Sequence, residues 1–527
     1  MWRSLVARLN GVQEAAGSTP VTRTNRSVLV GFKILQGHFA LSGFFGGGLV
    51  HNYLFDAYMN LWYNLLMKKQ CFNPYLPSWE YIPDGEPYVF DGRVYVYGSH
   101  DKAHGWVFCL NDYVCWSAPA DDLSDWRYEG VIYKKTDDPL NPDGRMCLYA
   151  PDVTVGSDGR YYLYYVLDKV NVVSVAVCES PAGKYEFYGY VRYPDGTRLG
   201  EREGDEPQFD PGVLTEGELT YLYTGFCGHG DTSRTGATAT VLGSDMLTIV
   251  EDPVIVVPGN CYGAGTGFEG HEYFEAASIR KMGDTYYFVY SSTPMNELCY
   301  ATSKHPAKGF TYGGVIVSNC DLHIDRYKSA DQHAYPAGNN HGSIVEINGR
   351  WFVFYHRMTN GTWFSRQGCM ERIEVLKDGS IPQVEMTSLG GNASPLEGRG
   401  EYPATIACNL FSLSETPEML PKITQYSGDD EPEPGYIADI TDSAVIGFKY
   451  FACVGVKRLT VRIRGYCKGC FEVRTSPDGS CLGSIPVVSA NIWTPFSADI
   501  SIPDGDHALY LLYKGTGKPS LACFILE

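Results

Sequence analysis

The sequence has no excess of positive charge and no long run of apolar residues. Lys and Arg number 42 against 61 Asp and Glu, which gives a formal net charge of −19. A protein that binds nucleic acid or an anionic membrane presents a basic patch, so neither partner is expected. The apolar stretches at 28–36 and 39–50 are interrupted by Lys33 and His38. They stay short of the ~20 residues of a membrane span, so no membrane partner is predicted.

A disulfide framework and a helical pattern are also missing. The 16 cysteines are scattered from Cys71 to Cys523, which in a chain of this length is typical of buried thiols in a reducing compartment. The one CxxC, Cys467 to Cys470, has no second pair at zinc-finger spacing, so we assign it a structural role. Amphipathic helices are scarce, whereas 39 Tyr and 58 Gly favour short strands and tight turns.

Residues 1–66 do not share the pattern of the rest of the chain. They lack the compact order of a secretory signal. We interpret them as an extension outside the native fold, with Met67 as the true start, which predicts a cytoplasmic enzyme. The alternative is a signal-anchor ending near Ala57, which would make the protein secreted or surface-attached.

Five glycine turns, each followed by an aromatic strand, recur along the chain. They are DGRVYVYGS, DGRYYLYYV, EGELTYLYTG, MGDTYYFVYSS and NGRWFVFYH, with glycines at Gly92, Gly159, Gly217, Gly283 and Gly349. Successive glycines are 67, 58, 66 and 66 residues apart. A unit of that length supplies about four short strands, which is the size of a propeller blade. The repeat predicts a five-bladed β-propeller over residues 67–380.

A polar residue precedes each of these glycines by seven or eight positions. The five residues are Asp84, Asp152, Asp210, Glu275 and His341. The first strand of each propeller blade lines the central axis, so these side chains are expected to converge there. Four acids and a histidine in one funnel would be costly unless they shared a ligand, a metal or a proton. The ring therefore indicates a functional site.

Residues 71–390 resemble glycoside hydrolase family 43. These enzymes use a five-bladed propeller to cleave arabinosides, xylosides and some galactosides with inversion of configuration. The segments that carry the resemblance are NPYLPSWEYIPDGEPYVFDGRVYVYGSHD (73–101), YAPDV (149–153), FDPGVL (209–214), FEAASIRKMGDTYYFVYSS (274–292) and NNHGSIVEINGRWFVFYHR (339–357).

The resemblance implies three catalytic carboxyls. Inversion needs an acid that protonates the leaving oxygen and a base that activates water on the opposite face. Glu275 matches the general acid and Asp84 the general base, while Asp210 matches the aspartate that keeps the acid protonated and oriented. An ionised aspartate nearby would raise the pKa of Glu275. The family usually has Asp-Pro at the base, but this chain reads Asp-Gly-Glu-Pro, so Glu86 is the alternative base and otherwise a substrate contact.

Three further residues are predicted to contact the substrate. Asp152 is assigned to sugar hydroxyls or to the fold rather than to proton transfer. His341 matches a histidine that, in relatives, holds a water or a calcium ion near the axis. Arg366 resembles an arginine that contacts the substrate or the acids, with a surface ion pair as the alternative. No cofactor is expected to be required, and a structural calcium ion held by His341 through water is the one candidate cation.

The C-terminal part has a different pattern. Residues 381–426 are rich in Gly, Pro and Ser and are interpreted as a packed connector. Residues 427–527 contain about seven short alternating stretches, which predict a jelly-roll-like β-sandwich. FKYF, DGDHALYLLYKG and the terminal FILE resemble a family 6 carbohydrate-binding module. The alternative is an accessory sandwich that binds no sugar.

Taken together, these features predict an inverting glycoside hydrolase that removes terminal sugars from plant-type oligosaccharides or polysaccharides. The preferred activity is that of an α-L-arabinofuranosidase. A β-xylosidase or a β-D-galactofuranosidase is the alternative within the family, and a non-catalytic carbohydrate-binding propeller is the alternative outside enzymes. The oligomeric state is left open.

Overall fold

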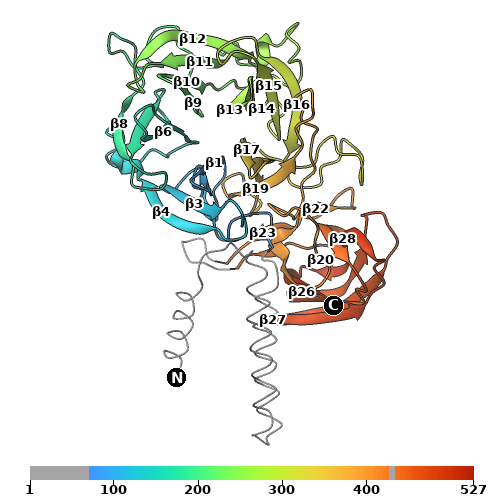
Figure 1. Ribbon diagram of the computed structural model, residues 1–527. Helices are drawn as coiled ribbons and strands as arrows, with labels where there is room; N and C mark the ends of the chain where they lie inside the picture. Colours follow the sequence, from blue (N-terminus) through green and yellow to red (C-terminus); the bar gives the residue numbers. More distant parts are fainter. Residues whose placement is uncertain (1–69, 427–433) are drawn as a thin grey trace, which may run out of the picture. The chain divides into compact units, whose positions relative to one another are not determined.

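The computed structural model describes residues 70–426 and 434–527 (Figure 1). Within these ranges the chain forms strands and three short 3-10 helices, η1 (Lys135–Asp137), η2 (Asn260–Tyr262) and η3 (Ala404–Ile406), but no α-helix. No described helix is long and apolar enough to cross a membrane. The interpretation of residues 1–66, including the start at Met67, concerns residues outside the described part of the chain.

Five antiparallel sheets follow one another along the chain, four with four strands and the last with three. Figure 1 shows them side by side around one axis. The five-bladed β-propeller predicted from the repeat is therefore confirmed. The strands are β1 (Glu86–Phe90), β2 (Arg93–Tyr97), β3 (Tyr113–Pro119), β4 (Arg127–Tyr133), β5 (Asp152–Val155), β6 (Tyr161–Tyr165), β7 (Ser174–Cys178), β8 (Glu186–Tyr190), β9 (Gly212–Glu216), β10 (Leu219–Thr224), β11 (Gly236–Leu242), β12 (Ile249–Pro258), β13 (Tyr273–Met282), β14 (Thr285–Ser292), β15 (Glu297–Ser303), β16 (Thr311–Ser318), β17 (Ile344–Ile347), β18 (Arg350–Met358) and β19 (Arg366–Ile373).

The turn glycines set the register of the inner hairpins. In the first blade Phe90 pairs with Arg93 across a two-residue turn, in which Asp91 has φ 48° and Gly92 has φ 75°. Two positive φ values suit the turn type that matches the twist of a hairpin, and they favour Asp-Gly and Asn-Gly. The turn thereby fixes the first strand of the blade and the polar residue that lies in it or just before it.

First strands of neighbouring blades lie beside each other at the axis. β9 packs beside both β5 and β13, and β1 packs beside β17. A parallel bridge between Gly85 and Gly342 joins the first blade to the fifth and closes the ring. Residues at one end of these strands are thereby brought to the axis from distant parts of the sequence.

The C-terminal domain is one curled sheet of ten strands. Residues Leu459–Arg464 of β26 pair with β29, and Cys467–Arg474 of the same strand pair with β28, while β27 runs along its other edge. Its strands are β20 (Leu396–Glu397), β21 (Gly400–Pro403), β22 (Asn409–Ser412), β23 (Lys422–Thr424), β24 (Tyr436–Ala438), β25 (Ala444–Cys453), β26 (Arg458–Arg474), β27 (Gly483–Asp499), β28 (Gly505–Gly517) and β29 (Ser520–Leu526). The all-β prediction holds, with one sheet folded around its own core.

Within the connector predicted at 381–426, residues 396–424 contribute four strands to this sheet. β20 and β22 pair with β25, and β21 pairs with β29. The reason is hydrophobic, because Leu396, Leu410 and Ile423 are buried in the core cluster that also holds Phe448 and Leu511. The Gly- and Pro-rich composition of the segment is typical of a connector, so these short strands were not predicted.

Candidate active site

A cavity of about 480 Å³ lies where the first strands of the blades converge. Its volume is that of a typical small-ligand site. Its walls are mostly aromatic and apolar, and acids, amides, one histidine and one arginine supply its polar groups. The lining residues are Asp84, Phe108, Cys109, Tyr149, Ala150, Val170, Asn171, Pro207, Gln208, Phe209, Asp210, Phe226, Phe274, Glu275, Met295, Asn339, His341, Trp363 and Arg366. The structure thus brings five of the seven predicted site residues into one cavity.

The three proposed catalytic acids lie at irregular points of the inner strands. Asp84 and Asp210 each precede a first strand by two residues and have φ 57° and 42°, in the left-handed region that non-glycine residues rarely adopt. Glu275 lies in β13 at a register shift, and Ala276 after it has φ 68°. Strained backbone of this kind is concentrated at functional sites, where the surrounding structure maintains it.

Asp84 is held by one guanidinium and one hydroxyl, with an imidazole close by. Its Oδ1 accepts a hydrogen bond from Arg366 Nη1 at 2.8 Å, and its Oδ2 accepts one from Ser99 Oγ at 2.5 Å. His356 Nδ1 lies 3.3 Å from Oδ1. Burial alone would raise the pKa of Asp84, but Arg366 and the two imidazoles of His341 and His356 outweigh it and hold the pKa well below its usual range. Asp84 is therefore the ionised carboxylate of the cavity.

Glu275 has no cation beside it. Asn339 Nδ2 donates to Glu275 Oε1 at 3.5 Å. Burial, followed by the negative charge of Asp84, raises the pKa of Glu275 to about 7. A buried carboxyl with this pKa can carry a proton near neutral pH and donate it to a leaving group.

Asp210 is raised in pKa as well. Its Oδ2 accepts the backbone N–H of Ala276 at 3.1 Å. Burial raises its pKa well above the usual range, and the charges of Glu275 and Asp84 act in the same direction. The sequence-based expectation was that an ionised Asp210 raises the pKa of Glu275. In the structure Asp84 supplies a further negative charge that raises the pKa of Glu275, while Asp210 and Glu275 act on each other as neighbouring acids.

His341 lies between the acids. Its Nδ1 is 3.6 Å from Asp210 Oδ2 and 3.9 Å from Asp84 Oδ1, and its Nε2 is 4.0 Å from Glu86 Oε1. Burial lowers the pKa of His341 to about 4, so the imidazole is neutral at pH 7.

The residues around His341 offer few direct ligands for the calcium ion expected there. Calcium takes six to eight oxygen ligands. Glu86 Oε1 has no hydrogen-bond partner among the described residues and faces the imidazole, but Asp84 is already engaged by Arg366. One carboxylate oxygen and one ring nitrogen are far too few, so a cation here would be ligated mainly by water. We derive no catalytic step through a metal.

Arg366 joins the cavity to the first blade. Its Nε and Nη2 donate to the two carboxylate oxygens of Asp101 at 2.8 and 3.0 Å, while Nη1 donates to Asp84. The guanidinium also lies 4.7 Å from the centre of the Phe108 ring. Such a two-pronged pair fixes the direction of the third N–H. Arg366 begins β19 in the fifth blade and is buried. Because it donates to Asp84 and Asp101 there, the alternative of a surface ion pair is excluded.

Glu86 and Asp152 do not line the cavity. Glu86 is 1% exposed, accepts from Arg280 Nη2 at 2.6 Å and from Ser278 Oγ at 3.1 Å. Asp152 is fully buried and accepts from Tyr88 Oη at 2.7 Å and from the backbone of Val213 at 2.8 Å. Burial raises the pKa of Glu86 to about 8 and that of Asp152 to about 6. The predicted substrate contacts of Glu86 and Asp152 do not fit this position, because both side chains are buried outside the cavity.

The turn of the second blade explains the misplacement of Asp152. Asp84, Asp210 and His341 each lie six residues before the last strand residue ahead of the turn. In the second blade that residue is Val155, which pairs with Tyr161 across a five-residue turn. Counting from the strand, the equivalent position is Tyr149, which does line the cavity. Counting back from Gly159 therefore selects Asp152, three residues after the equivalent position.

Sequence reasoning missed Asp101, His356, Ser99 and Arg280. The first three surround Asp84 directly or through Arg366. A signal existed for Ser99 and Asp101, since both follow the aromatic strand in YVYGSHD, and for His356 in the matching place of WFVFYHR. Arg280 lies five residues after Glu275 in the chain, and only the folded ring places it against Glu86.

Comparison with known proteins gives a consistent result. The sequence profile of glycosyl hydrolases family 43 matches residues 82–381. A xylosidase/arabinosidase of Thermoclostridium stercorarium is 72% identical over 470 residues, covering 87% of this chain and 99% of that protein. A xylosidase/arabinosidase of Bacteroides ovatus is 27% identical over 346 residues, covering 59% of this chain and 97% of that protein.

One solved structure of the same family is a β-xylosidase/α-arabinofuranosidase from a compost microbial metagenome, in complex with xylotriose in a calcium-free form. It is 26% identical, with a TM-score of 0.46, and covers 59% of this chain and 97% of that one. The profile match spans more than half of the chain and contains every acid of the cavity. The chain therefore belongs to glycosyl hydrolases family 43 and is an O-glycosyl hydrolase.

Proposed function

We propose that this enzyme removes terminal arabinofuranosyl or xylosyl residues by a single displacement with inversion. The observation that carries the proposal is the contrast inside one cavity, where Arg366 keeps Asp84 ionised while burial keeps Glu275 able to hold a proton. The substrate class is supported by the relatives named xylosidase/arabinosidase, one of which is 72% identical to this chain. Clustering of the acids also argues against a non-catalytic sugar-binding propeller.

The proposed reaction follows from these protonation states. Glu275 donates its proton to the glycosidic oxygen as the bond to the anomeric carbon breaks. Asp84 takes a proton from a water that attacks the anomeric carbon from the opposite face. Asp210 is fixed beside the acid by its hydrogen bond from the Ala276 N–H, where its carboxyl acts on the pKa of Glu275. The aromatic walls exclude bulk water, which strengthens the electrostatic interactions inside.

Asp84, rather than Glu86, is the proposed base. Glu86 Oε2 is occupied by Arg280 and Ser278, and the residue does not line the cavity. The pKa of Glu86, raised to about 8, would leave it protonated at neutral pH and unable to accept a proton from water. Asp84 meets both requirements, since it is ionised and exposed to the cavity.

The test combines product stereochemistry with a matched pair of variants. The purified protein is given 4-nitrophenyl α-L-arabinofuranoside and 4-nitrophenyl β-D-xyloside, and the first-formed sugar is followed by proton NMR. We expect the anomer of opposite configuration to the substrate. Asp84→Asn should lower kcat by about 10²–10⁴-fold, whereas Glu86→Gln should leave kcat within about tenfold. A retained anomer, or an equal loss in both variants, would overturn the assignment.

A further inference from the structure

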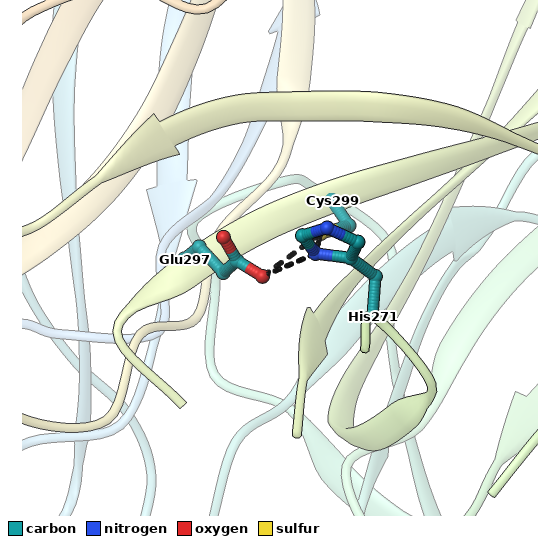
Figure 2. A group of neighbouring side chains, drawn as sticks. All are labelled: His271, Glu297 and Cys299. Atoms are coloured by element: carbon teal, nitrogen blue, oxygen red, sulfur yellow. Dashed lines mark hydrogen bonds and ion pairs between the residues drawn. The ribbon is translucent and has the colours of Figure 1, made fainter. Parts of the chain in front are cut away.

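A second group of reactive side chains lies in the fourth blade, outside the cavity. His271 precedes β13 by two residues, and Glu297 and Cys299 lie two apart on β15, so that their side chains share one face of the strand. Figure 2 shows the Glu297 carboxylate facing the imidazole of His271, with Cys299 close to the ring. One ligand atom from each residue lies within 4.8 Å of the others. None of the three lines the active-site cavity, and the glycosidase mechanism uses none of them.

The distances between the three donors are short and converge on one point. His271 Nδ1 is 2.6 Å from Glu297 Oε1. Cys299 Sγ is 3.9 Å from His271 Nδ1 and 3.7 Å from Glu297 Oε1. The ring is held in this direction by stacking on Tyr312, with centroids 4.9 Å apart and 13° between the planes. The arrangement is therefore built by the fold rather than by chance rotamers on a loose surface.

The carboxylate of Glu297 is incompletely satisfied. Its side chain is fully buried, and Oε1 accepts from His271 and from Ser292 Oγ at 2.6 Å. Oε2 has no hydrogen-bond partner among the described residues. A buried carboxylate oxygen without a partner is costly, and buried charges are normally paired or bound to a metal. Glu297 thus has coordinating capacity that the surrounding protein leaves unused.

From this geometry we propose that His271, Glu297 and Cys299 bind one zinc-like transition-metal ion. Zinc binds imidazole nitrogen and carboxylate oxygen at about 2.0–2.2 Å and thiolate sulfur at about 2.3 Å, in a tetrahedron. Those lengths place the ligand atoms roughly 3.3–3.5 Å from one another. The two sulfur distances need to shorten slightly, and the His271–Glu297 distance needs to open. The ion therefore replaces the hydrogen bond between them.

The donor set selects the class of ion. A thiolate and an imidazole suit zinc and related first-row metals, whereas calcium and magnesium prefer oxygen ligands alone. The imidazole of His271 is 29% exposed, so it offers a route of entry and leaves the fourth position to water. Binding releases the protons held on the thiol and on the imidazole nitrogen, because both must be free to coordinate.

The position of the site indicates a structural role. His271 precedes β13, the strand that carries Glu275, while Glu297 and Cys299 belong to β15 on the far side of β14. A metal bridge would tie the entry of the acid-bearing strand to the third strand of its blade. Zinc should therefore raise the melting temperature of the protein, because an ion that binds only the folded state stabilises it.

Cobalt titration of the full-length protein tests the proposal. Co²⁺ bound by a thiolate gives a charge-transfer band in the near ultraviolet and intense visible bands in a tetrahedral site. We expect these bands to saturate at one Co²⁺ per chain and to disappear when Zn²⁺ is added. Wild-type protein without a thiolate-to-cobalt band overturns the proposal, whatever the variants do.

Matched cysteine variants locate the site. Cys299→Ser should abolish the thiolate band, while Cys261→Ser and Cys481→Ser, which change two exposed thiols elsewhere, should keep it. Glu297→Gln should weaken zinc binding at least tenfold and is the second variant if Cys299→Ser does not fold. A band that survives Cys299→Ser, or that is lost with either exposed thiol, places the metal elsewhere and rejects the assignment.

Discussion

Two sets of carboxylates lie near the propeller axis, and they differ in what neutralises them. Asp84, Asp210 and Glu275 line the cavity, where one of the three is paired with Arg366. Glu86 and Asp152 lie outside it, against protein donors. Both sets are buried, so burial alone does not distinguish a reactive acid from a structural one.

The two sets differ in the direction of their pKa shifts and in whether their carboxyls line the cavity. In the cavity the pKa values diverge, with Asp84 held low and Glu275 raised to about 7. Pairs of acids whose environments separate their pKa values are the mark of an acid and a base. Glu86 and Asp152 are both raised, to about 8 and about 6, and both share the field of Arg280. The first set can supply both an acid and a base, whereas the second has a structural role between the blades.

The sharpest way to separate the two sets is to change one acid from each. Glu275→Gln removes the proton donor and should lower kcat on unactivated xylosides and arabinosides by about 10²–10⁴-fold. Asp152→Asn, buried beside Tyr88, should change kcat by less than about tenfold. Steady-state kinetics on both variants, with circular dichroism to verify folding, make the comparison.

The pH profile gives the control for this pair. Since Glu275 must carry its proton and its pKa is about 7, wild-type kcat/KM should fall as the pH rises above about 7. That limb should be absent from the residual activity of Glu275→Gln and present in Asp152→Asn. A basic limb that persists in Glu275→Gln would assign the acid to another residue.

Much of the propeller and of its active site can be predicted from the sequence repeat, because a glycine turn and an aromatic strand are local features. Asp84, Asp210, Glu275 and His341 could be found by counting back from the turn. Asp152 could not be placed in this way, since the second blade has a five-residue turn and the count from Gly159 then selects the wrong position. Turn length is a local property that a glycine alone does not reveal.

Other features depend on contacts that the sequence does not contain. Arg280 pairs with Glu86 across 194 positions, and Arg366 pairs with Asp101 across 265. Neither ion pair has a local signal, so the ionisation of Asp84 and the role of Glu86 became visible only in the folded ring. The same holds for β20 to β23, whose strands are too short to show a period of two.

The next largest effect is expected in the structural set. Arg280→Met removes the cation 2.6 Å from Glu86 and leaves Ser278 as the one donor to Glu86 Oε2 among the described residues. Because Glu86 is protonated at neutral pH, the change removes a hydrogen bond from a charged donor, and the free energy of unfolding should fall by about 1.5–3 kcal/mol. Urea denaturation measures it. The matched variant Arg326→Met, which removes a largely exposed arginine 3.8 Å from Glu385, should cost less than about 1 kcal/mol.

If Arg280→Met were no less stable than Arg326→Met, Glu86 and Asp152 would not form a structural set. A loss of kcat without loss of stability would instead connect Arg280 to the chemistry. Either result would remove the division between the two groups of carboxylates.

A smaller effect is expected from pH on wild-type stability. The pKa of Glu86 is about 8 in the folded state and near 4.5 in the unfolded chain, and that of Asp152 is raised to about 6. An acid whose folded pKa is raised contributes stability below its unfolded pKa, and this contribution is lost as the pH rises through the folded value. The free energy of unfolding should therefore decrease between pH 5 and pH 8, by an amount on the order of 1–3 kcal/mol. Urea denaturation at both values measures the change, and Glu86→Gln should reduce it.

The smallest expected effect concerns one hydroxyl. Tyr88→Phe removes the 2.7 Å hydrogen bond to Asp152 but keeps the ring, over which the Arg280 guanidinium lies at 4.3 Å. Asp152 keeps the backbone N–H groups of Val153 and Val213, so the loss is one donor of three. The unfolding free energy should fall by about 1–2 kcal/mol, and kcat should not change. A selective fall in kcat would mean that Asp152 communicates with the cavity through Tyr88, and the two carboxylate sets would then act as one network.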